Sequence, residues 1–373
     1  MKIDKIEVFQ VDLPYSGGTY LLSGGRTYDC FDATVVRLTT ACGIEGWGES
    51  TPFGSTYIAA HARGVRAGIA EIAPRLLGCD PRHVDRTYDV MNDSLAGHPH
   101  SKTPLDVACW DIFGKAVDMP VCDLLGGSTR SRMPVISSIY AGDPDDMRQR
   151  INEHRKAGYR GHSVKIGASE QEGGPSLDAE RIKASLADFR PGEFFIVDAN
   201  GGLTLEHAMR FLRLLPEGLD FVLEAPCSTW REHRILRQRS NVPIYFDELV
   251  DSDSALASII TDGAAEGIGL KISKNGGLTQ GRKQRDMCLA AGLVMSVQDT
   301  VGSDIAFAAI VHLAQTIPES YLRCALDTRD MVTVSTAKMD CVIEHGGIVA
   351  PSEPGLGLEP DLHVLGKPIL SYS

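Results

Sequence analysis

Six short stretches of strand-forming residues each end in a charged or polar side chain that could take part in chemistry. In chain order these side chains are Lys165, Asp198, Glu224, Asp247, Lys271 and Gln298. Three carboxylates that met at one point would repel one another unless a cation lay between them. Oxygen ligands without a neighbouring Cys or His favour Mg²⁺ over zinc. An amine beside such a cation has a lowered pKa and can serve as an acid or a base near neutral pH. The pattern therefore predicts a divalent cation flanked by two amines.

These side chains need elements that bring six strand ends to one place. They recur at intervals of roughly 23 to 33 residues, about the length that a strand, a crossover helix and two loops require. Each lies at the C-terminal end of its apolar run, where a β/α barrel has its active site. Eight strands are predicted, at residues 133–141, 161–167, 194–199, 221–225, 243–247, 268–273, 293–298 and 321–327. Because a helical pattern follows each of the first seven, the predicted fold class is α/β, a modified (β/α)7β TIM barrel.

An α+β capping domain is predicted before the barrel. The stretches IDKIEVFQVDL, DATVVRLTT and GIEGWGES have the alternation of a β-meander, and the chain from Tyr57 to about Asp118 has the apolar spacing of helices. The glycine-rich stretch PYSGGTYLLSGGRTYDC is expected to be an exposed loop. The predicted division is a capping domain at 1–125, a barrel at 126–330 and a C-terminal segment at 331–373 that returns to the capping domain.

Charge and composition narrow the classes of partner. The net charge is −12 and no basic run occurs, so nucleic acid and anionic membrane surfaces are poor partners. No stretch of 18 or more apolar residues occurs, and the N-terminus passes directly into a strand, so a cytoplasmic location is expected. The nine cysteines include no CxxC pair and are expected to be buried, reduced thiols.

The same residues also have purely structural explanations. Each carboxylate lies near a strand-to-helix turn, where it could be a solvated loop acid or a helix N-cap. Lys165 and Lys271 could be ion-pair partners that balance the acids, and Lys274 is expected to serve charge balance. The position of all three acids at the ends of consecutive strands favours the metal site over these alternatives.

Several motifs together resemble the enolase superfamily, within its muconate lactonizing enzyme subgroup. The motifs are VKIG, VDAN, LEAP, FDE and LKISKNGG, with GIEGWGES, DVACWDIFGKA, VCDLLGG and PGLGLEPD elsewhere in the chain. The resemblance covers nearly the whole sequence. It implies that Asp198, Glu224 and Asp247 bind Mg²⁺ and that Lys165 and Lys271 are the acid/base pair. It also implies that Asn200 and Glu248 orient these groups.

Two departures from the subgroup bear on the substrate. Strand 2 carries Ser163-Val164-Lys165 where the subgroup usually has Lys-x-Lys, so Lys165 is expected to be more basic than usual. The common glutamate near the end of strand 7 is Gln298, followed by Asp299 and Thr300. On strand 8, only Asp327 remains of the Asp-x-Asp pair of dipeptide epimerases, which makes a peptide substrate less probable. Asp327 could hold one cationic nitrogen or could be a structural ion pair.

The resemblance implies removal of a proton α to the carboxylate of a small, amino-acid-like substrate. The expected reaction is elimination of water from cis-3-hydroxy-L-proline to give Δ1-pyrroline-2-carboxylate. The alternatives are a racemase or 2-epimerase of proline betaine or hydroxyproline betaine, and a non-catalytic binding protein with this fold. A homo-oligomer is expected.

Two segments are expected to close over the barrel mouth and select the substrate. They are the loop 15–29 and the segment Thr51–Tyr57, with Tyr20, Phe53 and Tyr57 as candidate pocket walls. The predicted substrate contacts are Tyr57, Gln298, Asp299, Thr300 and Asp327.

Overall fold

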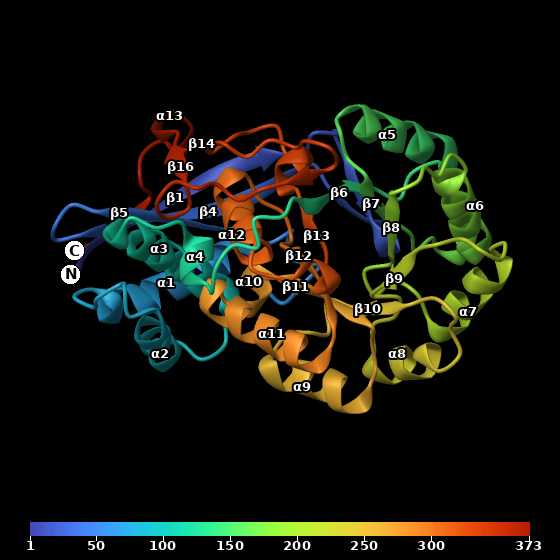
Figure 1. The fold of residues 1–373 in the computed structure, drawn as a ribbon, viewed down its shortest axis with the longest axis horizontal. Coiled ribbons are helices and arrows are strands. Elements are labelled where there is room, and N and C mark those ends of the chain that lie inside the picture. The colour runs from blue at the N-terminus through green and yellow to red at the C-terminus, as the bar shows by residue number, and fades with distance from the viewer.

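Eight parallel strands close into a barrel in the computed structural model, which describes residues 1–373 (Figure 1). The last strand pairs with the first through Ala325 and Val135, so the sheet has no free edge. The strands are β6 (Met133–Ile139), β7 (Gly161–Lys165), β8 (Phe194–Asp198), β9 (Val222–Glu224), β10 (Ile244–Phe246), β11 (Gly267–Lys271), β12 (Val294–Gln298) and β13 (Leu322–Leu326). The predicted β/α barrel is confirmed.

A helix follows each of the first seven barrel strands. These helices are α5 (Pro144–Lys156), α6 (Gly174–Leu186), α7 (Leu205–Leu214), α8 (Trp230–Arg237), α9 (Asp253–Asp262), α11 (Leu278–Ala291) and α12 (Asp304–Ala314). A short turn, α10 (Ile272–Asn275), precedes α11. Helices and strands share a core of 56 buried residues. Burial of apolar area on this scale is the main stabilising term of the barrel.

The N-terminal part is an antiparallel sheet covered by helices. Its strands are β1 (Ile3–Pro14), β4 (Cys30–Thr40), β5 (Glu45–Ser50) and β17 (Leu370–Tyr372), and its helices are α1 (Ala62–Leu76), α2 (Val84–Ser94) and α3 (Pro99–Val117). Helix α3 lies against β5 at Gly46 and Gly48, where an added Cβ would come within 2.2 Å of a backbone oxygen of α3. Both positions therefore require glycine.

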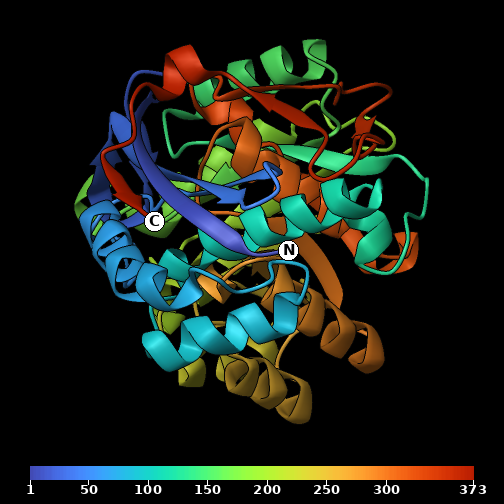
Figure 2. The same cartoon turned by 90° about the vertical axis from the view of Figure 1, so that its left-hand side faces the viewer.

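The C-terminal residues lie against the N-terminal sheet. Strand β17 pairs with β1 through Ile6 and Tyr372, and Figure 2 shows both termini on this side of the molecule. The tail also contains β14 (Ala337–Met339), β15 (Gly347–Ile348), β16 (Leu358–Pro360) and α13 (Leu362–Leu365). At Gly355 it bridges to Pro120, next to α4 (Val121–Leu124) in the connection to the barrel. The domain boundaries at 125/126 and 330/331 stay predictions.

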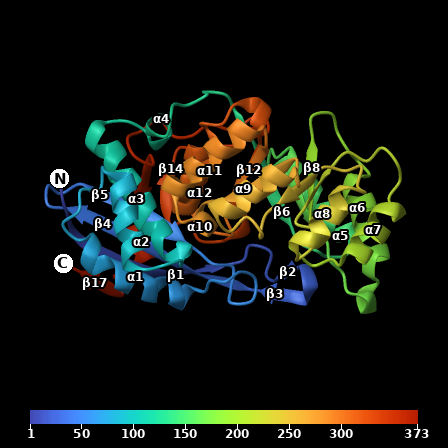
Figure 3. The same cartoon turned by 90° about the horizontal axis from the view of Figure 1, so that it is seen from below.

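Three local expectations need correction. The cysteines are free thiols, but Cys30 and Cys42 are exposed and Cys79 is partly exposed, so only six of the nine are buried as expected. The glycine-rich stretch after β1 is a short hairpin of β2 (Tyr20–Leu22) and β3 (Arg26–Tyr28) rather than an exposed loop, because Tyr20 and Leu22 are buried (Figure 3). The sixth barrel strand ends at Lys271 instead of residue 273, because the chain turns into α10. No helix of the chain has both the length and the apolar character needed to cross a membrane.

Candidate active site

The strand register gathers the three predicted carboxylates at the C-terminal end of the barrel. Asp198 is in register with Glu224 on the next strand, and Asp247 directly follows β10. All three residues are at most 1% exposed. Strand β11 leaves room for them at Gly269, where an added Cβ would lie 2.9 Å from Glu224 Oε1 and 3.3 Å from Asp247 Cβ. The convergence of the acids thus depends on a glycine in the neighbouring strand.

Three lysines supply positive charge to this group. The Lys165 ammonium on β7 donates to Asp198 Oδ2. On the other side, Lys271 Nζ on β11 lies 2.6 Å from Asp247 Oδ2, and Lys274 Nζ donates to Asp247 Oδ1 at 2.8 Å. Lys165 and Lys271 therefore reach the carboxylates from opposite flanks of the arc of strands, as the predicted acid/base pair requires. Lys274 has the charge-balancing contact expected of it.

These ion pairs shift the pKa values of the groups involved. Burial is the largest single effect and favours the neutral form of Lys165, but the charge and hydrogen bond of Asp198, with Tyr20 and Glu224, together outweigh it and raise the pKa of the amine. Asp247 likewise raises the pKa of Lys271 against the effect of burial. The pKa of Asp247 is lowered, because Lys271 and Lys274 outweigh its burial. Burial and the charges of Asp198 and Asp247 raise the pKa of Glu224 well above its ordinary value. Without a cation, both amines are protonated and Glu224 is the acid that resists ionisation.

Gln298, a neutral side chain at the end of β12, donates a hydrogen bond to Glu224. Gln298 Nε2 donates to Glu224 Oε1 at 2.9 Å and to Ser296 Oγ at 2.9 Å. The predicted strand-7 residue thus contacts a proposed metal ligand, and it also lines the active-site cavity.

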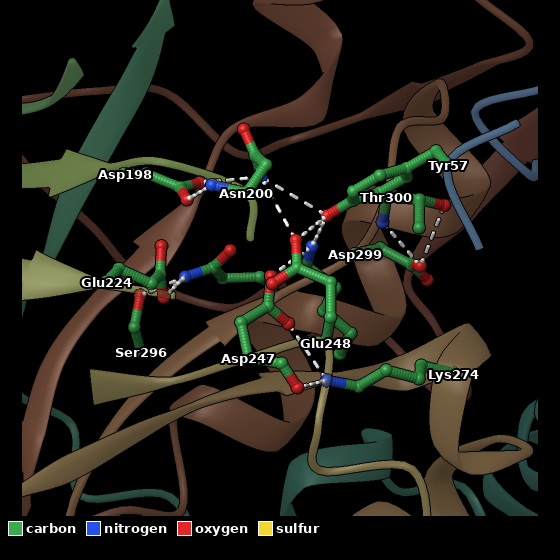
Figure 4. A network of polar contacts seen from close by, with 12 residues as sticks. Tyr57, Asp198, Asn200, Glu224, Asp247, Glu248, Lys274, Ser296, Asp299 and Thr300 are labelled. Atoms are coloured by element: carbon green, nitrogen blue, oxygen red, sulfur yellow. Dashed lines mark hydrogen bonds and ion pairs between the residues drawn. The ribbon is translucent and has the colours of Figure 1, made fainter. Parts of the chain in front are cut away.

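Asn200, Glu248 and Tyr57 form a second layer around the carboxylates (Figure 4). Asn200 Nδ2 donates to Asp198 Oδ2 at 3.0 Å and to Glu248 Oε1 at 3.1 Å. The Tyr57 hydroxyl donates to Glu248 Oε1 at 2.6 Å and accepts from Lys271 Nζ at 2.8 Å. A residue of the N-terminal part therefore touches one of the two amines directly.

A small cavity of about 20 Å³ lies between these groups and the N-terminal segments. Tyr57, Gln298, Asp299 and Thr300 line it, together with Tyr20, Leu22, Phe53, Ser138, Ser163, Lys165, Asn200, Lys271, Leu326 and Met331. The volume is about that of one water molecule. The cavity in this form is too small for an amino-acid-sized substrate.

The two aspartates proposed as substrate contacts differ in their surroundings. Asp299 accepts from Ser273 Oγ at 2.7 Å and from Thr300 N at 2.7 Å, and burial raises its pKa to about 6. Asp327 is not among the cavity residues. It pairs with Arg329 through two hydrogen bonds of 2.9 and 2.8 Å and accepts from the Tyr159 hydroxyl. The geometry of Asp327 is that of a structural ion pair, so the expectation that it holds a substrate nitrogen finds no support here.

The oxygens at the barrel mouth fit a hard cation in chemistry and burial. Asn200 Oδ1, Glu248 Oε2 and Asp247 Oδ2 are buried and have no hydrogen-bond donor, although Lys271 lies close to the last. The three carboxylates do not form a set with all ligand atoms within 4.8 Å, a condition that Glu170, Glu206 and His207 meet instead. Ligands of one Mg²⁺ lie about 4 Å or less from their neighbours. Binding would therefore require Asp198 and Asp247 to turn from the lysines toward Glu224.

The second acidic cluster has no comparable features. Glu170 and Glu206 are exposed, and Arg210 and His207 already pair with Glu170. Exposed ion pairs of this kind contribute little and need no bound metal.

Three cavity residues were missed by sequence reasoning. Ser138 and Leu326 lie at the C-terminal ends of β6 and β13, so the strand-end rule that found the other residues could have found them. Met331 lies in the turn after β13, and no local pattern marks it.

Comparisons with known proteins agree with this geometry. The enolase C-terminal domain-like family matches residues 146–364, and the mandelate racemase/muconate lactonizing enzyme N-terminal domain matches residues 26–126. A cis-3-hydroxy-L-proline dehydratase from Roseibium aggregatum is 38% identical over 373 residues, which covers 100% of both chains.

The chain belongs to the enolase superfamily.

Two further relatives extend the comparison for this enolase superfamily enzyme. A protein of the mandelate racemase/muconate lactonizing type from Roseovarius nubinhibens, solved in complex with magnesium, is 54% identical, with a TM-score of 0.98 and 100% coverage of both chains. An N-succinyl-L-Arg/Lys racemase from Bacillus cereus is 26% identical over 317 residues, 84% of each chain. The relatives thus include both a dehydratase and a racemase.

Proposed function

We propose that this enzyme is a Mg²⁺-dependent dehydratase that converts cis-3-hydroxy-L-proline to Δ1-pyrroline-2-carboxylate. The observation that carries the proposal is the position of two buried amines, Lys165 and Lys271, on opposite flanks of one group of carboxylates. The full-length likeness to the Roseibium dehydratase supports the choice of substrate.

We assign the metal to Asp198, Glu224 and Asp247, with Asn200 and Glu248 orienting them. Mg²⁺, when bound, would supply the positive charge that stabilises negative charge developing on the substrate carboxylate. If Asp198 and Asp247 held the metal instead of the two lysines, the lysines would lose the interaction that raises their pKa values. One amine can then lose its proton and act as a base.

Lys271 then takes the α-proton from one face of the ring, and Lys165 gives a proton to the 3-hydroxyl on the other face. The Cα–H bond and the C3–O bond break, a Cα=C3 double bond forms, and the hydroxyl leaves as water. The cis relation of hydroxyl and carboxylate places the hydroxyl trans to the α-hydrogen, which suits two opposed amines. The resulting enamine tautomerises to the imine product. Tyr57, Gln298, Asp299 and Thr300 would contact the ring, because they line the cavity.

Turnover by single lysine variants tests the proposal. Wild type, Lys165→Ala and Lys271→Ala are incubated with Mg²⁺ and cis-3-hydroxy-L-proline, and the cyclic imine is measured. Both variants should lose at least about 10³-fold in kcat, since each removes an acid or base that no neighbour replaces. Lys183→Ala, at an exposed lysine paired with Glu180, is the matched control and should keep full activity. Dehydration at the wild-type rate by either active-site variant would refute the two-amine mechanism.

A racemase or 2-epimerase of proline betaine or hydroxyproline betaine is the second candidate. Amines on both sides of a substrate also suit proton removal and return, and one relative is a racemase. In D₂O, α-deuterium in recovered betaine identifies this reaction, whereas loss of water identifies dehydration. A non-catalytic binding protein would do neither. A homo-oligomer and a cytoplasmic location stay predictions.

A further inference from the structure

Glu49 is a buried carboxylate that the proposed reaction does not use. It lies at the end of β5 in the GWGES motif and is 2% exposed. No cation pairs with it: its donors are Thr51 Oγ1 at 2.8 Å, Ser303 N at 3.0 Å and Ala306 N at 3.2 Å. Burying a carboxylate without a counter-charge costs free energy unless hydrogen bonds replace those to water. The three donors to Glu49 therefore stabilise it in its buried position.

Two of these donors, Ser303 N and Ala306 N, lie at the N-terminus of a barrel helix. Helix α12 begins after Ser303, whose own side chain makes no capping hydrogen bond. By contrast, α5, α7, α8 and α9 are capped by their own Asp143, Thr204, Thr229 and Ser252. Glu49 thus supplies from the N-terminal sheet the acceptor that α12 lacks, and its charge is favourable at a helix N-terminus.

The third donor, Thr51, is the first residue of a segment that lines the cavity with Phe53 and Tyr57. We name residues 51–57 the lid segment. Thr51 donates to Glu49, and its backbone oxygen accepts from Thr300 Oγ1 at 2.6 Å. Thr51 also forms a β-bridge with Val301. The lid segment is therefore anchored at its first residue to the strand-7 end of the barrel.

The other end of the lid segment reaches the catalytic amine. Tyr57 contacts Lys271 and Glu248 at 2.8 and 2.6 Å (Figure 4). Between the two ends, Phe53 packs edge-on against Tyr20 and Tyr28, with ring centroids 5.1 and 4.8 Å apart. A displaced anchor at Thr51 would therefore move the aromatic wall of the cavity and the hydroxyl that touches Lys271.

We infer that Glu49 is a positioning residue: it joins the first turn of α12 to the lid segment and so sets Tyr57 against Lys271. The expected change in KM rests on the proposed function. The anchoring of the lid segment by Glu49 does not depend on it. If Glu49 were only a helix cap, its replacement would lower the stability of the fold and leave the lid segment unchanged. If it also anchors the lid segment, its replacement changes both.

Asp106 provides a matched control on the same domain. It is fully buried in α3 and accepts from Thr279 N at 2.9 Å and Thr279 Oγ1 at 2.5 Å. Asp106 therefore caps the N-terminus of α11, because the N-cap residue of that helix, Gly277, has no side chain. Asp106 has the same relation to a barrel helix as Glu49 but makes no hydrogen bond to the lid segment.

The experiment compares Glu49→Gln, Thr51→Val and Asp106→Asn in the full-length protein. Hydrogen exchange of a peptide covering residues 51–60, thermal unfolding, and KM with cis-3-hydroxy-L-proline are measured. Glu49→Gln should speed exchange of the peptide by about tenfold or more and raise KM similarly, because a donor replaces an acceptor at the anchor. Thr51→Val removes only one hydrogen bond and should speed exchange by about fivefold without uncapping α12.

Asp106→Asn should lower the unfolding midpoint, as Glu49→Gln does, yet leave exchange of residues 51–60 within about twofold of wild type. The inference is overturned if Glu49→Gln lowers the midpoint with unchanged exchange and KM, or if Asp106→Asn accelerates exchange equally. If Glu49→Gln does not fold, Thr51→Val decides the question. Hydrogen exchange of residues 51–60 at the wild-type rate in Thr51→Val would then be enough to overturn the inference. If wild type does not turn over hydroxyproline, the proposed substrate fails while the exchange comparison still decides the anchor.

Discussion

Replacing Gln298 by glutamate would test how strongly the carboxylates at the barrel mouth repel one another. Gln298 Nε2 is the side-chain donor to Glu224 Oε1, at 2.9 Å, and the pKa of Glu224 is already raised well above its ordinary value by burial and by Asp198 and Asp247. Gln298→Glu keeps the shape of the side chain, removes this donor and adds a charge. The variant should therefore destabilise the metal-free protein in a pH-dependent way.

The size of the effect follows from the distance. Two unit charges about 3 Å apart repel by about 6 kcal/mol at an effective dielectric constant of about 20. Because Glu224 already resists ionisation in the metal-free protein, the added carboxyl relieves the repulsion at this site by holding a proton of its own, which for a carboxyl with a pKa of about 4.3 costs about 5 kcal/mol at pH 8 and about 2 kcal/mol at pH 6. The folded-state pKa is raised, so the stability of the variant approaches that of wild type at low pH and is lost as pH rises.

Urea unfolding in EDTA at pH 6 and pH 8 measures these losses. Gln298→Met is the control, because it removes the donor without adding charge and should cost about 1–2 kcal/mol at both pH values. Mg²⁺ should reduce the loss in Gln298→Glu, since a bound cation offsets the added charge. Wild-type stability of Gln298→Glu at pH 8, or an equal loss at both pH values, would show that the 2.9 Å contact does not control the charge of this site.

Three further predictions concern the metal, Glu49 and Asp327. Replacing EDTA by Mg²⁺ should raise the unfolding midpoint of wild type, with about 2.7 kcal/mol of stabilisation at a hundredfold excess over Kd, and Asp247→Asn should abolish most of this rise. Burial raises the pKa of Glu49 to about 7 in the folded state, so stability from this group is full below about pH 4.5 and is lost as pH rises through about 7. Between pH 6 and pH 8, wild type should lose about 1 kcal/mol of unfolding free energy relative to Glu49→Gln, and parallel pH profiles would contradict this assignment. Asp327→Asn should cost about 2–3 kcal/mol by leaving a partly buried Arg329 without its carboxylate, while KM stays within about twofold; a tenfold rise in KM would return Asp327 to the substrate site.

The barrel could be predicted because its information is local and repeated. Each strand is a short apolar run, each helix has its own spacing of apolar residues, and the polar group falls at the end of the strand. Parallel pairing then leaves little freedom, since Lys165 and Asp198 or Lys271 and Gln298 come into register once adjacent strands pair. The β2–β3 hairpin was not predicted, because its few apolar residues become buried only through contact with distant parts of the chain.

The partner of a charged side chain could not be predicted in the same way. Asp327 has a neighbour two residues away, Arg329, that neutralises it, but sequence alone left this ion pair and a substrate contact equally open. Glu49 caps a helix that begins about 250 positions later in the chain, and Tyr57 contacts Lys271 from another part of the fold. Such contacts depend on where two separately formed elements meet in space.

The sequence by itself determined that the barrel's strands and helices form, that they close into a barrel, and at which strand ends the acids and amines lie. These features follow from periodicity and from the two-residue alternation of side chains along a strand. Only the tertiary structure decided which acid pairs with which amine, how small the cavity is, and that α12 takes its cap from the N-terminal sheet. Charges and hydrogen bonds act over a few ångströms in space, and that distance is set by packing rather than by position along the chain.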